Sequence, residues 1–82
     1  MAVYYFDFID DVVRLDTYGT ELPDRDAARR EAVAALAAIA ADSMRAGAEK
    51  TLRMNVREES GHGHIIKVCL TVTVEEEAPD AG

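Results

Sequence analysis

The sequence predicts a two-layer α+β domain of ββαββ order, in which a four-stranded, mainly antiparallel sheet carries one helix on one face. Two stretches of alternating polar and apolar residues precede a single long helical stretch, and two more alternating stretches follow it. A chain of 82 residues can bury one hydrophobic core but not two. We therefore expect a single domain over residues 1–77 and a disordered acidic tail over residues 78–82.

The N-terminal part of the chain is predicted to form a β-hairpin. Residues 3–9 are rich in aromatic and β-branched side chains, which favour strands. Alternation places Asp7 opposite the aromatic residues at even positions, so the face without Asp7 is expected to be buried. Asp10 and Asp11 supply the turn, and residues 12–17 alternate again. A connection containing a glycine then leads to the helix.

The helix is predicted from residue 24 to residue 46. Asp24 follows a proline and can accept the free N–H groups of a helix start. Gly47 is suited to the left-handed conformation that ends a helix, and Asp26 and Arg30 are spaced for an i,i+4 ion pair. Apolar and small residues at helical spacing form a stripe that should lie on the sheet. This stripe consists of Ala32, Val33, Leu36, Ile39, Ala40 and Ser43.

Two further strands are predicted over residues 52–57 and 66–75, where apolar and polar side chains alternate. Residues 59–63 between them have the glycine spacing of a hairpin loop. The alternation does not determine the strand order. Because the first and last strands are the most apolar, we expect them in the middle of the sheet.

The net charge of −7 argues against general binding to nucleic acid or to anionic membranes, although residues 45–67 are net positive. Cys69 is the only cysteine, so no intramolecular disulfide can form. The sequence has neither a signal-peptide pattern nor an apolar run long enough to cross a bilayer. These features predict a cytoplasmic protein without membrane association.

The histidines His62 and His64 are candidate metal ligands, since they lie near Glu58 and Glu59 and histidine and carboxylate together can bind zinc or nickel. Their spacing matches no zinc signature, and no second cysteine or histidine pair completes a four-ligand site. A polar turn is the preferred interpretation. We expect no bound metal and no cofactor.

No constellation of residues predicts catalysis. Cys69 lies between Lys67 and Thr71, where a cation could lower the pKa of the thiol. A nucleophile also needs a positioned base, and the histidines lie toward the loop end of the same strand. An acidic cluster around the first hairpin lacks calcium-loop spacing and is typical of a turn. The cluster consists of Asp7, Asp10, Asp11 and Asp16. We expect that the protein is not an enzyme.

One helix covers one face of a sheet, so the other face is the expected place for an interaction site. Cations beside an aromatic residue are typical of single-strand nucleic-acid binding, but only one aromatic lies on this face. Alternating charged and threonine residues also occur on ordinary solvated sheets. A protein partner or self-association is therefore preferred over nucleic acid, which is not excluded. The expected interaction face comprises Tyr5, Arg14, Arg53, Arg57 and Lys67.

Three motifs occur together in the sequence: YYFD at residues 4–7, GTELPD at residues 19–24 and AARREA at residues 27–32. They resemble a family of short bacterial proteins of unknown function, with a YFD strand, a G-x-E-x-x-D connection and an AAR-x-EA helix. The resemblance extends over nearly the whole chain and implies no activity, ligand or catalytic residue. The GHGH loop lies outside its pattern. Within the helix motif, Arg29 falls on the sheet-facing stripe and is expected to pair with Asp7 or Asp16.

The leading functional hypothesis is a small cytoplasmic binding or accessory module that uses its exposed sheet face or strand edges. It would act on a protein partner or as a homodimer, because unpaired strand edges are templates for pairing. Replacing Tyr5 or Thr71 by lysine should then disrupt a sheet-face dimer. The alternative is a nucleic-acid-associated or antitoxin-like regulator whose acidic body neutralises a basic partner.

Overall fold

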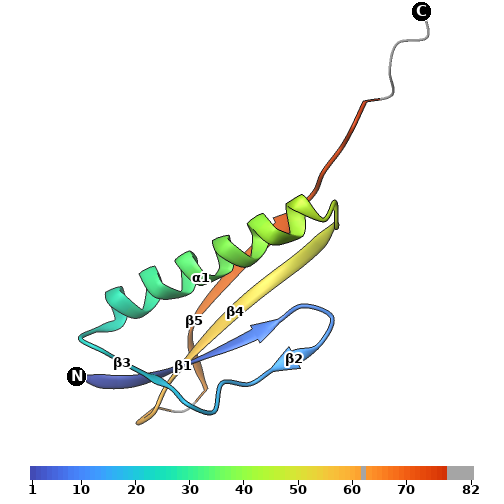
Figure 1. Ribbon diagram of the computed structural model, residues 1–82. Helices are drawn as coiled ribbons and strands as arrows, with labels where there is room; N and C mark the ends of the chain where they lie inside the picture. The colour runs from blue at the N-terminus through green and yellow to red at the C-terminus, as the bar shows by residue number, and fades with distance from the viewer. Residues whose placement is uncertain (62, 78–82) are drawn as a thin grey trace, which may run out of the picture.

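The computed structural model describes residues 1–61 and 63–77, and in it a single helix lies across one face of an antiparallel sheet (Figure 1). The sheet has five strands in the order β2-β1-β4-β5, and β3 pairs with β1. The α+β class and the single helix are confirmed. The elements are β1 (Ala2–Ile9), β2 (Val13–Arg14), β3 (Thr20–Leu22), α1 (Arg25–Arg45), β4 (Lys50–Glu58) and β5 (His64–Val72).

The predicted ββαββ order with four strands matches the five-stranded sheet only roughly, because the first hairpin is built differently. The second predicted strand shrinks to the two residues of β2, which pair with Phe8 and Ile9. The chain then bends at Asp16, whose carboxylate accepts the N–H groups of Tyr18 and Gly19. After this bend the expected connection rejoins the edge of β1, running in the same direction as β2, and forms β3.

The predicted strand order is wrong for the last strand. β1 and β4 are central, whereas β5 lies at an edge of the sheet. Residues 4–9 of β1 pair with residues 53–58 of β4, and β4 also forms the hairpin with β5. The apolar content of β5 therefore does not mark a central position, and Leu70 remains 38% exposed.

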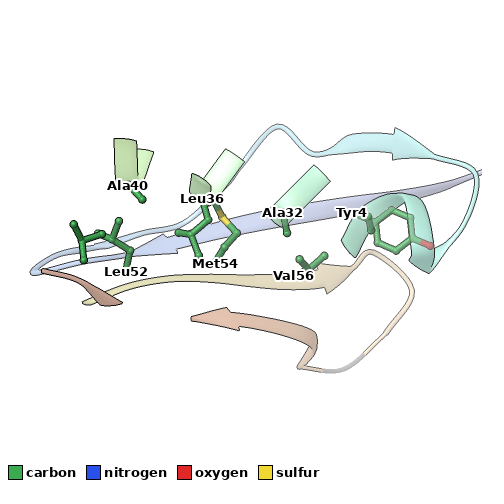
Figure 2. Packing of buried hydrophobic residues seen from close by; sticks show 9 residues of the cluster. Tyr4, Ala32, Leu36, Ala40, Leu52, Met54 and Val56 are labelled. Carbon is green, nitrogen blue, oxygen red and sulfur yellow. The ribbon is translucent and has the colours of Figure 1, made fainter. Parts of the chain in front are cut away.

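The core lies between α1 and the central strands. Small residues at four-residue spacing let the helix approach the sheet closely, and Leu36 points from the helix toward the sheet, beside Met54 (Figure 2). Ala32, Leu36 and Ala40 of the predicted stripe are buried, but Val33 is 46% exposed on the flank of the helix. The buried core consists of Tyr4, Ala28, Ala32, Leu36, Ala40, Leu52, Met54, Val56 and Val72.

The helix begins and ends as predicted. The Asp24 side chain accepts the N–H of Ala27 at 2.8 Å. Gly47 follows the helix with φ 72°, in the left-handed region. The predicted ion pair between Asp26 and Arg30 forms at 3.3 Å. None of the helices in the described residues is long and apolar enough to cross a membrane.

The expected contact of Arg29 with Asp7 or Asp16 is wrong. Arg29 is exposed and donates to Asp26 at 2.7 Å, one turn earlier on the helix. Asp7 lies on the sheet face that points away from α1, so a helical side chain cannot reach it. The predicted tail over residues 78–82 lies outside the described residues.

Candidate functional site on the open sheet face

The sheet face that points away from α1 is called the open face here. Its residues alternate with the buried core residues of the same strands, and the register pairs Tyr5 with Arg57 and Arg53 with Cys69. The open face consists of Val3, Tyr5, Asp7 and Ile9 of β1, Thr51, Arg53, Asn55 and Arg57 of β4, and His64, Lys67, Cys69 and Thr71 of β5.

Asp7 is buried on this open face, with only 1% of the residue exposed. Arg57 donates to both of its oxygens, from Nε to Oδ2 at 2.7 Å and from Nη2 to Oδ1 at 3.0 Å. The backbone N–H of Asp16 also donates to Oδ1 at 3.0 Å, and Nε2 of His64 lies 3.1 Å from Oδ2. Asp7 thus joins β1, β4, β5 and the β2–β3 connection.

Asp16 closes the outer edge of β1 with its side chain. Its Oδ2 accepts the N–H of Phe6 at 3.1 Å, midway between the parts of β1 that pair with β2 and with β3. Its main-chain carbonyl accepts Nη2 of Arg57 at 3.1 Å. A carboxylate therefore takes the place of a strand partner where the neighbouring chain turns away.

The charges of this network favour the ionised forms. Burial raises the pKa of Asp7, but the hydrogen bonds from Arg57, the Asp16 backbone and His64 outweigh it, and the pKa lies below its usual value. Burial likewise raises the pKa of Asp16, and the N–H groups of Phe6, Tyr18 and Gly19 lower it further than burial raises it. The hydrogen bond to Asp7 raises the pKa of Arg57.

Tyr5 is covered on one side by Arg57, whose Cζ lies 4.9 Å from the ring centroid. Gly19 packs at the edge of the same ring. A Cβ at Gly19 would come within 2.6 Å of Val3 Cγ1 and 3.0 Å of Tyr5 Cε1. Tyr5 and Arg57, both predicted for the interaction face, are therefore used largely within the protein.

A family model described as a domain of unknown function, DUF6894, matches residues 3–75. The chain belongs to this family. The match extends from β1 to beyond β5, so all the described elements belong to the DUF6894 domain. The family description assigns no function, in agreement with the resemblance seen in the sequence. The chain has no match among curated proteins or solved structures.

In the DUF6894 domain, Arg53 and Lys67 differ from Arg57 in their exposure and in their ion pairing. Both are exposed, and within residues 1–61 and 63–77 neither forms an ion pair. They are diagonal neighbours, because Arg53 pairs with Cys69 and Asn55 with Lys67. The prediction for Arg14 is wrong, since the register places Arg14 opposite Phe8 on the helix side of the sheet.

The candidate metal ligands are only partly described. His64 lies against Asp7 at the end of β5, while His62 is outside the described residues. Where the structure is described, no group of three or more His, Cys, Asp and Glu residues could hold a metal ion. Cys69 is a free, exposed thiol opposite Arg53 rather than beside a histidine. The open face thus offers exposed cations beside a satisfied ionic network.

The Asp7–Arg57 pair is the part of the site that sequence reasoning missed. The two residues are 50 positions apart, and each alone is typical of a solvated strand position. The signal that could have found the pair is a lone acidic residue within an aromatic strand and arginines at alternate positions of a later one. Only the β1–β4 register brings these positions together.

Proposed function

We propose that this DUF6894 domain is a cytoplasmic protein-binding module that takes up an extended segment of a partner protein along β5. The observation that carries this proposal is the difference between the two edges of the sheet. The outer edge of β1 is occupied by β2, by β3 and by the carboxylate of Asp16. β5 pairs with β4 on one side, and no strand of the described chain pairs with its other side.

The free edge is long and little protected. β5 has nine residues, and Lys67 is the only lysine, arginine, aspartate or glutamate among them. The strand contains no proline, and its one irregularity lies at the end nearest the loop, opposite Val56 and Arg57. Unpaired N–H and C=O groups on such an edge are a template for a further strand.

A binding role fits these groups better than a catalytic one. The hydrogen bonds of Asp7 and Asp16 are made within the protein, and these bonds hold strands together rather than converge on a cavity. Nucleic-acid binding receives less support, because Tyr5 is the only Tyr, Phe or Trp among the open-face residues and Arg57 covers one side of its ring. Cytoplasmic location is part of the proposal, since the single cysteine is a free thiol.

A second copy of the chain is a less favoured occupant than a different protein. If two β5 strands paired antiparallel about Val68, each Lys67 would lie opposite Cys69 of the other copy and diagonal to its Lys67. The two lysines would repel each other. Each copy also carries a net charge of −7, which adds repulsion between like chains at low salt.

The test is amide hydrogen exchange of ¹⁵N-labelled protein, free and with a partner captured from its native cells and then purified. In the free protein we expect alternate β5 amides to exchange fast, because their N–H groups point to solvent. The partner should slow these amides by at least about tenfold, while β1 amides provide the internal control. Unchanged exchange along β5 in the complex would contradict strand addition. Sedimentation of the free protein would show whether a second copy of the chain occupies the edge instead.

A further inference from the structure

The open face has a charge opposite to that of the whole chain. The sequence contains 16 Asp and Glu residues, yet Asp7 is the only one on the open face of the fully described strands β1, β4 and β5, and Glu21 of β3 lies at the opposite edge of the sheet, beside Val3. Arg57 already neutralises Asp7 at 2.7 Å. The exposed charges that remain beside the free edge are those of Lys67 on β5 and Arg53 on β4. Although the protein as a whole is acidic, this part of its surface therefore attracts negatively charged groups.

The other side of the same edge is apolar. Val68 and Leu70 of β5 lie on the helix side, opposite the buried residues Met54 and Leu52. Val68 is partly buried, whereas Leu70 is 38% exposed because β5 has no outer neighbour in the described chain. An added strand would remove this apolar surface from water.

A strand added to β5 points its side chains alternately to the two faces. Side chains on the open face would lie beside Lys67, and those on the helix side would pack on Val68 and Leu70. We propose that the partner segment is an extended strand in which acidic and apolar residues alternate. This inference rests on the proposed strand addition and names the chemistry of its occupant.

The net charge of −7 does not prevent this recognition. At physiological ionic strength the screening length is about 8 Å, so charges far from β5 act weakly on a bound segment. Lys67 would lie directly beside the added strand, about 5 Å away between Cβ atoms. The phosphates of a nucleic acid would pair with the cations, but a nucleic acid has no apolar side chains to pack on Leu70. The test must therefore distinguish nucleic-acid binding from peptide binding.

The test compares short peptides of equal length by fluorescence anisotropy: one alternating Glu and Val, one alternating Lys and Val, and one alternating Glu and Ser. We expect the Glu/Val peptide to bind the wild type at least about tenfold more tightly than either of the others. Lys67→Glu should reverse the preference between the Glu/Val and Lys/Val peptides. Arg25→Glu makes the same charge change at the start of α1 and should leave the preference intact.

Each other outcome has a defined meaning. Equal binding of the Lys/Val peptide, or equally tight binding of a single-stranded oligonucleotide, would overturn the inference. If no peptide binds while a captured partner still protects the β5 amides, the inference fails and strand addition stands. If neither peptides nor partner protect β5, the proposed function fails as well.

Discussion

At the scale of single residues, the buried carboxylate of Asp7 is the group around which the polar contacts of the open face are arranged. A buried carboxylate needs compensation, because its desolvation cost is several kcal/mol when it is unpaired. Arg57 supplies two hydrogen bonds, and the Asp16 backbone supplies a third. With His64 of β5, the groups around the Asp7 carboxylate come from three separate parts of the chain. The loss of any one of them should therefore lower the stability of the whole sheet.

Arg57→Ala should lower the free energy of unfolding by about 2–4 kcal/mol, because it leaves Asp7 buried without its counter-charge. Arg53→Ala is the matched control, since Arg53 lies on the same strand and face but is exposed and forms no ion pair in the described part of the chain. It should change stability by less than about 0.5 kcal/mol. Urea denaturation measures both, and equal effects would show that Arg57 acts only as a solvated side chain.

The free energy of unfolding should fall at acidic pH, because the folded protein lowers the pKa of Asp7. Its pKa is lower in the folded protein than its usual value, so folding favours the ionised form. The resulting stabilisation is complete above about pH 5 and is lost as the pH falls through the folded pKa. Asp7→Asn should therefore destabilise the protein at neutral pH, and the difference from wild type should shrink toward about pH 3. Urea titrations at several pH values measure it; a constant difference would contradict this assignment.

Gly19→Ala should be more damaging than Gly47→Ala, although both glycines have positive φ. A Cβ at Gly19 meets Val3 and Tyr5, while a Cβ at Gly47 meets nothing within 4 Å. Both variants bear the cost of a left-handed alanine, about 1 kcal/mol. Gly19→Ala adds a steric clash worth about 1–3 kcal/mol. Thermal unfolding compares the two, and similar losses would mean that the clash relaxes freely.

At the scale of elements, the sequence predicts those helices and strands whose positions depend on neighbouring residues. The helix was predicted from its aspartate cap and glycine end, and β4 and β5 from alternation, since these patterns depend only on neighbouring residues. β3 was missed because its position depends on the bend at Asp16, ten residues from the Phe6 N–H that it caps. The Asp7–Arg57 pair and the place of β5 at the edge depend on register and strand order, which alternation cannot define.

Asp16→Ala should loosen the outer edge of β1. The variant loses the acceptors for the N–H groups of Phe6, Tyr18 and Gly19, so the β2–β3 connection loses its bend. We expect faster amide exchange at Phe6 and a loss of about 1–3 kcal/mol in stability. Asp11→Ala, at an exposed position of the same hairpin, is the control. Unchanged exchange at Phe6 would show that the carboxylate is not its acceptor.

At the scale of the whole molecule, the sheet is asymmetric: one edge is closed by short strands and a side chain, and the other is a full-length strand with one charge. A charged side chain on an edge strand disfavours pairing between copies. Lys67 thus has two roles in the proposals above, since it repels a second β5 and attracts an acidic segment. The two roles can be tested independently, because the first requires no partner.

Lys67→Val should increase self-association of the purified protein, because it removes the only Lys, Arg, Asp or Glu side chain from the edge strand β5. We expect concentration-dependent dimers by analytical ultracentrifugation under reducing conditions, which exclude a disulfide through Cys69. Arg53→Val makes a similar change on the open face of the inner strand β4 and should leave the oligomeric state as in wild type. Dimers of both variants would indicate association through the open face, and dimers of neither would indicate that the edge is protected by something other than charge.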